Sequence, residues 1–134
     1  MTIESAEEFI RLRSSEDPSE YERASHDDAP IDVWYRLISE YPDMRFWVAH
    51  NRSVPNDVLA VLARDPSADV RSRVADVRRL SRDLFDLLSR DDNEGVRNRV
   101  AVNKKCPRDI LEGLLDDPWE VVRDTVSRRL AEMD

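Results

Sequence analysis

Apolar residues recur along this chain at an interval of 26 positions. In one register a valine or methionine is followed each time by an arginine, and a second valine comes three positions after that arginine. The members are Met44, Arg45 and Val48; Val70, Arg71 and Val74; Val96, Arg97 and Val100; and Val122, Arg123 and Val126. A fixed period of this length indicates stacked structural units, each of which buries its apolar face only against its neighbours.

Each unit carries the pattern of two short helices. In residues 65–90, Asp65 can accept hydrogen bonds from the free amides of a helix start, and Pro66 lacks the N–H that this position leaves unused. The apolar stripes are Val70, Val74 and Ala75 in the first helix and, after Ser81, Leu84, Phe85, Leu87 and Leu88 in the second. Helices shorter than about 12 residues are marginal alone in water, so the pattern predicts helix pairs that stack.

The first third of the chain contains a weaker copy of the same pattern. Residues 29–38 align with residues 54–63, and Ser5 and Glu8 have the spacing of a capping box at the start of a further helix. The sequence therefore predicts an all-α fold, a single α-solenoid domain over residues 1–134. Its expected parts are an acidic amino-terminal cap with a degenerate repeat (1–38), three full repeats (39–64, 65–90 and 91–116) and a partial carboxyl-terminal repeat (117–134).

The segment DPSADVRSRVA at residues 65–75, followed by a spacer and a leucine-rich run, resembles the leucine-rich repeat variant family and, more broadly, HEAT-like helical repeats. The resemblance covers about residues 39–134, and small bacterial proteins built on this repeat are similar along their whole length. It rests on Asp65, Pro66, Val70, Arg71, Val74, Ala75, Asn103, Pro107, Leu111 and Leu114. The resemblance implies a right-handed superhelix of paired helices and no reaction. Founding members also carry a cysteine-rich iron–sulfur segment, which this chain lacks, so no cofactor is expected.

Composition agrees with one globular domain, and charge divides the chain. Of 134 residues, 40% are apolar and 37% are charged. Residues 1–43 carry twelve Asp or Glu against four Arg, a net charge of -8, whereas residues 44–134 carry seventeen of each sign. The acidic total argues against nucleic acid as a partner, although the balanced portion leaves room for a basic face. No apolar run of about 20 residues and no basic leader is present, which predicts a cytoplasmic protein without a membrane segment.

The residues that usually carry chemistry are few and scattered. Cys106 is the only cysteine and occupies an apolar slot of the repeat, so neither a disulfide nor a thiolate metal site is expected. His26 and His50 are the only histidines, and the slot of His50 holds acidic, apolar and basic residues in the other repeats. No glycine-rich phosphate loop occurs. The sequence predicts no catalytic residue, no metal and no cofactor, and hence no enzyme.

Basic residues form the main candidate for partner binding. They recur at the links between the two helices of successive repeats, which should follow one edge of a solenoid as a basic ridge. These residues are Arg52, Arg78, Arg79, Lys104, Lys105, Arg128 and Arg129. Two interpretations remain open: the cations complement helix carboxyl ends, or they hold an acidic protein surface or a nucleic-acid backbone. The arginine that follows the first valine of each repeat favours a structural role, in which its guanidinium bonds carboxylates or helix-end carbonyls.

Two tryptophans are further candidates. Trp47 lies beside Phe46 where the other repeats have polar residues, so we expect the amino-terminal segment, through Phe9 or the stretch around Tyr21, to cover it. Trp119 falls near a repeat boundary, where an exposed side chain is expected. If either is bare, it becomes a candidate docking residue.

These features favour a non-catalytic macromolecular binding module. A protein partner is the first expectation, with an adaptor or an immunity-like inhibitor as the analogy. The alternatives are nucleic-acid binding along the basic ridge, with base-processing chemistry as its extreme form, and self-assembly. In the last case the helix predicted at residues 121–130 would pair across a twofold axis, so that the protein is either a monomer or a homodimer.

Overall fold

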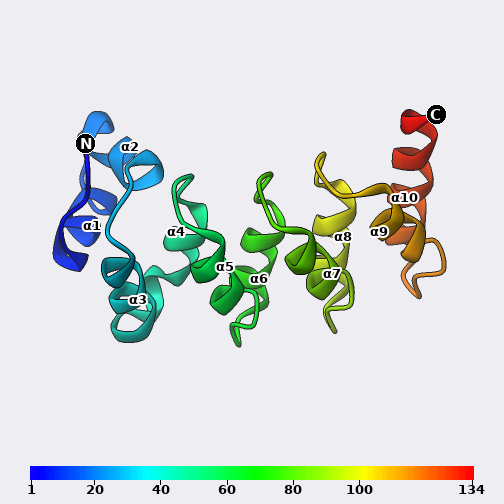
Figure 1. The fold of residues 1–134 in the computed structure, drawn as a ribbon, viewed down its shortest axis with the longest axis horizontal. Coiled ribbons are helices and arrows are strands. Elements are labelled where there is room, and N and C mark those ends of the chain that lie inside the picture. Colours follow the sequence, from blue (N-terminus) through cyan, green and yellow to red (C-terminus); the bar gives the residue numbers. More distant parts are fainter. The chain divides into compact units, whose positions relative to one another are not determined.

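A computed structural model describes all 134 residues as ten α-helices and one short 3₁₀ helix (Figure 1). The only β-type contact is an isolated bridge between Thr2 and Asp28. The prediction of an all-helical chain is therefore confirmed. The helices group into two compact units, Met1–Leu62 (unit 1) and Ala63–Asp134 (unit 2).

Unit 1 is built around two buried aromatic side chains. Its elements are α1 (Ala6–Arg13), α2 (Pro18–His26), α3 (Ile31–Glu40), a 3₁₀ helix η1 (Pro42–Met44), α4 (Arg45–His50) and α5 (Asn56–Leu62). Ser5 caps α1 by accepting from the Glu8 N–H at 3.0 Å, which fits the predicted helix start. Phe9 of α1 packs edge-on against Trp34 of α3 with 5.6 Å between the ring centroids, and both are fully buried.

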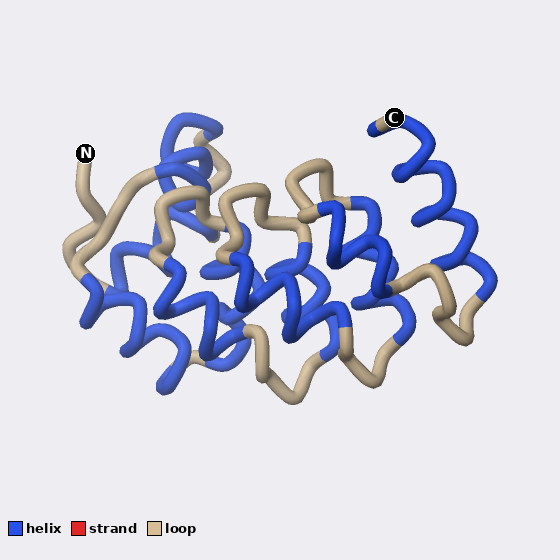
Figure 2. Tube along the Cα trace, turned by 45° about the vertical axis from the view of Figure 1, so that its right-hand side comes forward, coloured by secondary structure: helices blue, strands red, loops and turns tan.

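Unit 2 contains α6 (Ala68–Ala75), α7 (Arg82–Ser89), α8 (Glu94–Val102), α9 (Arg108–Gly113) and α10 (Glu120–Met133). The links α6–α7 and α8–α9 lie at one edge of this unit, and the links α7–α8 and α9–α10 lie at the opposite edge (Figure 2). Its core consists of the apolar positions that the repeat pattern singles out. They are Val70, Val74, Ala75, Leu84, Phe85, Leu88, Val96, Val100, Ala101, Leu111, Leu114, Val122 and Val126.

The helix starts of unit 2 differ from the sequence prediction in one detail. Asp65 was expected to cap the first helix, but Ser67 is the N-cap of α6, and its hydroxyl accepts from the Val70 N–H. The Asp65 carboxylate instead accepts from the Ser67 N–H at 2.9 Å. An aspartate that bonds the amide two residues later forms a tight turn of its own, so the helix begins after the Asp-Pro pair and not with it.

One arginine per helix pair bridges two successive links of unit 2. Arg97 donates from Nε and Nη2 to the Asp117 carboxylate at 2.7 and 3.3 Å, and from Nη1 to the Asp91 carbonyl at 2.7 Å. Arg71 makes the same contacts with Asp91 and with the carbonyl of Asp65. This fork geometry satisfies carboxylate and carbonyl together. The structural interpretation of these arginines is confirmed.

The bridge carboxylates are largely shielded from water. The side chain of Asp117 is 3% exposed and that of Arg97 is 14% exposed. Burial alone would raise the pKa of Asp117, but the hydrogen bonds from Arg97 and from the Trp119 N–H outweigh it and lower that pKa below its ordinary value. The buried carboxylate therefore keeps its charge because the bridge is present.

At the edge of unit 2 opposite to the arginine bridges, the links are joined by the neutral side-chain amide of Asn103. Asn103 Nδ2 donates to the carbonyls of Ala75 and Val77 at 2.8 and 2.9 Å, and its Oδ1 accepts from the Lys105 N–H. In unit 1, Asn51 makes the corresponding contacts with the carbonyls of Ala24 and Asp27. Both asparagines are buried, so each must be fully bonded, and each fixes two link segments against one another.

We expect Arg97→Met to lower the free energy of unfolding by about 2–4 kcal/mol, because it leaves the Asp117 carboxylate buried without its partner. Urea unfolding followed by circular dichroism measures the effect. Arg82→Met is the matched control, since Arg82 also pairs with an aspartate, Asp109, but both side chains are more than half exposed. That control should shift the unfolding midpoint little. Equal losses in the two variants would contradict the bridging role.

Candidate functional site

The cations of unit 2 that the ridge hypothesis names lie along one edge. Arg78 and Arg79 follow α6, Lys104 and Lys105 follow α8, and Arg128 lies in the second half of α10. All five side chains are exposed. We call these five residues the basic edge. The Asn103 amide joins the α6–α7 link to the α8–α9 link, and Arg129, the neighbour of Arg128, joins α10 to the α8–α9 link.

Most other cations of unit 2 are neutralised within the fold. Ion pairs engage Arg71, Arg73, Arg82, Arg90, Arg97, Arg99, Arg108 and Arg129. Arg123 instead donates to the carbonyls of Asp117 and Pro118. By contrast, Arg78, Lys104, Lys105 and Arg128 form no ion pair. Arg64, which lies elsewhere in unit 2, shares that property. Unpaired positive charge in this unit is thus concentrated at one edge.

Arg129, a ridge candidate, has a different role. Its Nη1 donates to the carbonyls of Ala101 and Asn103 at 2.8 and 3.0 Å, and its side chain is 13% exposed. These contacts repeat, one helix pair later, those that the Asn103 amide makes. Arg129 therefore fastens α10 to the α8–α9 link and contributes little to the accessible surface. Arg52, the remaining ridge candidate, is exposed in unit 1, after α4.

Trp47 is covered by the amino-terminal segment, as the sequence predicted. The guanidinium carbon of Arg13 lies 3.4 Å from the Trp47 ring centroid and 4.6 Å from that of Tyr21. Phe46 packs edge-on against Trp47 at 4.9 Å between centroids. The contact was expected through Phe9 or Tyr21, but Phe9 lies on Trp34 and Arg13 reaches the tryptophan. The sequence analysis assigned no role to Arg13, and this cation–π contact was not predicted.

Trp119 has the exposure that the sequence predicted, with 37% of its surface open to solvent. It is the N-cap residue of α10 but makes no side-chain capping bond. The corresponding residues Ser67 and Asn93 both cap their helices through side-chain oxygens. A missing cap costs about 1 kcal/mol. At this position the chain carries an exposed indole in place of a stabilising polar group.

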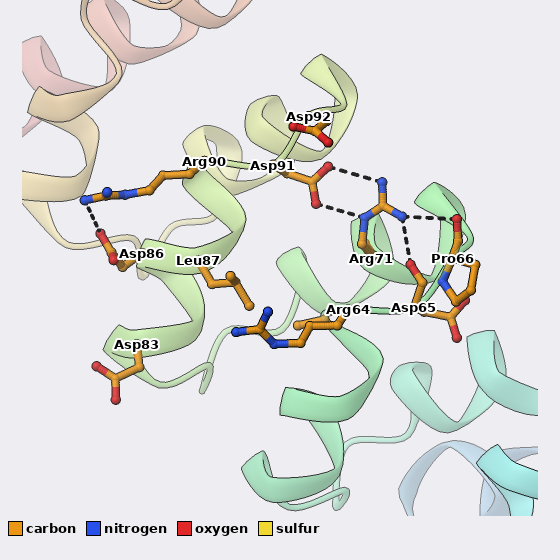
Figure 3. Close-up of a pocket in the computed structure, with 11 residues that line it drawn as sticks. Arg64, Asp65, Pro66, Arg71, Asp83, Asp86, Leu87, Arg90, Asp91 and Asp92 are labelled. Atoms are coloured by element: carbon orange, nitrogen blue, oxygen red, sulfur yellow. Dashed lines mark hydrogen bonds and ion pairs between the residues drawn. The ribbon is translucent and has the colours of Figure 1, made fainter.

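A hollow of about 750 Å³ lies on the other edge of unit 2, between the Asp65–Pro66 link and α7 (Figure 3). Arg71 turns toward Asp91 and Asp65 at its rim, and Arg90 pairs with Asp86. Its lining is completed by Ala63, Arg64, Pro66, Asp83, Leu87 and Asp92. The hollow brings together carboxylates and guanidinium groups but no histidine, cysteine or serine. The repeat pattern does not reveal this hollow, because its lining comes from two links and from the helices α6 and α7.

Groups that could carry out chemistry are few here. No group of three or more His, Cys, Asp or Glu side chains is arranged to hold a metal ion. Cys106 is 3% exposed, and burial raises the pKa of its thiol to about 11. A buried thiol with a raised pKa is a poor nucleophile, because the thiolate is the reactive form. The structure thus places this cysteine among the core residues, where the sequence predicted it.

We expect Cys106 to react with a disulfide reagent at pH 8 at least about a hundredfold more slowly in the native protein than in denaturant. The raised pKa lowers the thiolate fraction by roughly that factor, and burial slows access further. Because the pKa is raised, the native rate should climb as the pH increases toward 11. Thiol titration by absorbance measures both rates, and equal rates in the two states would contradict the assignment.

We expect Trp119→Asn to raise the free energy of unfolding by about 0.5–1.5 kcal/mol, because an asparagine N-cap accepts from a free amide of the first turn. At the matching position, Asn93→Ala removes an existing cap, since Asn93 Oδ1 accepts from the Gly95 and Val96 N–H groups. This change should lower the free energy of unfolding by a similar amount. Chemical denaturation measures both. A loss of stability in the Trp119 variant would show that the indole contributes to folding.

Comparison with known proteins gives no further assignment. No protein-family model, no curated protein and no solved structure matches this chain. Among its ten α-helices, none is both long and apolar enough to cross a membrane. The resemblance to leucine-rich repeat variant and HEAT-like proteins therefore stays a prediction from the residues themselves.

Proposed function

We propose that this protein is a non-catalytic binding module that holds an acidic surface of a protein partner along the basic edge. Arg78, Lys104, Lys105 and Arg128 are the residues proposed to carry the binding, with Arg79 beside them. The supporting observation is that Arg78, Lys104, Lys105 and Arg128 are exposed and form no ion pair, in a unit that pairs most of its other cations. Unpaired rim charges steer association and select partners of opposite charge.

Charge balance favours a protein over a nucleic acid as the partner. Unit 2 carries fifteen Lys or Arg against sixteen Asp or Glu, and the whole chain has a net charge of -8. A long polyanion would meet the carboxylates as well as the cations and would be repelled by them. An acidic patch on a folded protein can match the five cations without approaching the rest of the surface.

The proposed architecture is a short right-handed α-solenoid of the leucine-rich repeat variant and HEAT-like type. Three recurrences support this assignment: the arginine bridges at 71 and 97, the link-carbonyl contact that Arg71, Arg97 and Arg123 share, and the carbonyl contacts made by Asn103 and Arg129. Such folds present regular edges to other proteins and lack an enclosed reaction site. An adaptor or immunity-like inhibitor acting in the cytoplasm is the biological role that fits this proposal.

The test is reversal of the unpaired charges: Arg78→Glu, Lys104→Glu, Lys105→Glu and Arg128→Glu in one protein. Affinity capture from the native host and anisotropy with a labelled Glu/Asp peptide measure binding. We expect the reversal to lose the captured partner and to weaken peptide binding at least about tenfold. The matched control keeps every charge, with Arg78→Lys, Lys104→Arg, Lys105→Arg and Arg128→Lys, and should retain both activities.

Two outcomes would overturn the proposal. Recovery of the same partner by the reversed protein would show that the interface lies elsewhere. Tighter binding of a short DNA duplex than of the acidic peptide, with affinity that falls steeply as salt rises, would assign the edge to nucleic acid. Circular dichroism of each variant confirms that the helices are intact before binding is compared.

A further inference from the structure

We infer that Leu115, Trp119 and Val121 form a second docking surface, which takes a protein segment with apolar side chains flanked by lysine or arginine. We call these three residues the apolar corner. This inference goes beyond the proposed function. The apolar corner and the basic edge consist of different residues, lie at different places in unit 2 and would bind partners of opposite charge.

Large exposed apolar side chains in unit 2 all lie in its carboxyl-terminal half. The large ones are Val102, Leu115, Trp119, Val121 and Met133. Three of the five fall within seven residues, at the α9–α10 link and the first turn of α10. Their exposed fractions are 42% for Leu115, 37% for Trp119 and 43% for Val121. Single exposed apolar residues are ordinary, but a local group of them marks an interaction site.

The repeat itself shows that these three residues are not required by the fold. One period earlier the positions of Leu115, Trp119 and Val121 hold Ser89, Asn93 and Gly95, and two periods earlier Ala63, Ser67 and Asp69. Ser67 and Asn93 cap the corresponding helices through their side chains. Trp119 even replaces a capping side chain and makes no capping bond. An aromatic residue that weakens its own helix start and stays exposed fits the anchor of a binding site.

The charges around the apolar corner specify the partner. Asp116, Glu120 and Asp124 are exposed and form no ion pair. Along the chain these three carboxylates alternate with the three apolar residues. The nearby Asp117 is not counted with them, because it forms an ion pair with Arg97. Three carboxylates outweigh the partial positive charge of the α10 amino terminus. A segment with both apolar and basic side chains matches this surface, and an acidic segment would be repelled.

The apolar corner and the basic edge lie at different places in unit 2. The apolar corner lies at the α9–α10 link, and the basic edge follows the α6–α7 and α8–α9 links at the opposite edge of unit 2 (Figure 2). The unit therefore offers two surfaces of opposite charge preference. Neutralising one surface should leave binding at the other intact.

The experiment uses the full chain and a synthetic amphipathic helix of leucine and lysine. NMR spectra of the tryptophan indole N–H groups locate the contact, and titration gives the affinity. We expect the Trp119 indole signal to shift, while that of the buried Trp34 stays in place. Trp119→Ser should weaken binding about tenfold or more, and Leu115→Ser and Val121→Ser several-fold each. Joint replacement Asp116→Asn, Glu120→Gln and Asp124→Asn should weaken binding several-fold and reduce its dependence on salt.

Matched controls keep the test specific. Val102→Ser removes an equally exposed valine outside the apolar corner and should leave the affinity unchanged. A peptide with every lysine replaced by glutamate should bind at least about tenfold more weakly to the native protein. The basic-edge variant with Arg78→Gln, Lys104→Gln, Lys105→Gln and Arg128→Gln should bind the leucine–lysine peptide normally, so failure of one surface is distinguishable from failure of the other.

Three results would overturn the inference. The first is equal affinity of Trp119→Ser and the native protein for the leucine–lysine peptide. The second is equal binding of the leucine–glutamate peptide. The third is a shift of the Trp119 signal with protein concentration alone, together with a doubled mass that Trp119→Ser abolishes, because the occupant would then be a second copy of this chain.

Discussion

Unit 2 depends on a guanidinium–carboxylate bridge that joins one interhelical link to the next. Arg97 binds the Asp117 carboxylate with two nitrogens and the Asp91 carbonyl with a third, while Arg71 does the same one helix pair earlier. Apolar burial drives the helices together but has no preferred direction. The bridge supplies that direction, since a nearly buried carboxylate tolerates one partner geometry and is costly without it. Short helices that would be marginal alone are thereby held in a fixed register.

The two edges of unit 2 solve the same packing problem with different chemistry, and this difference explains where free charge remains. At one edge the links are joined by arginine and aspartate, which neutralise one another. At the other edge the Asn103 amide and the Arg129 guanidinium each donate to two carbonyls, so the links are joined without an aspartate. Lys104 and Lys105, which follow Asn103 in the chain, form no ion pair within the fold. Their charge stays unpaired because the hydrogen bonds that join the links at this edge end on carbonyls and not on carboxylates.

Much of this could be predicted from the sequence, because a 26-residue period repeats its physical roles. The valine and leucine stripes identified the core, and the strict register of Arg71 and Arg97 identified the bridges. The start of α6 was predicted two residues too early, because an Asp-Pro pair fits both a cap and a preceding turn and only the backbone path distinguishes them. Arg13 could not be assigned to Trp47, since a cation–π contact between residues far apart in sequence leaves no periodic trace. The same limit hid the hollow, whose lining comes from separate elements.

The last helix pair shows what deviation from the repeat means physically. Arg129 takes the position that Asn103 has in the preceding repeat, and it makes equivalent contacts with two carbonyls. The fold therefore explains this difference from the repeat. Trp119 takes the position that Asn93 has in the preceding repeat, but it makes no capping bond and is not buried. The fold therefore does not explain this difference from the repeat. A substitution that preserves the local hydrogen bonds needs no explanation beyond structure. A substitution that gives up local stability and stays in solvent is not explained by the fold, and this contrast, more than the size of the tryptophan, is why we propose the apolar corner as a docking surface.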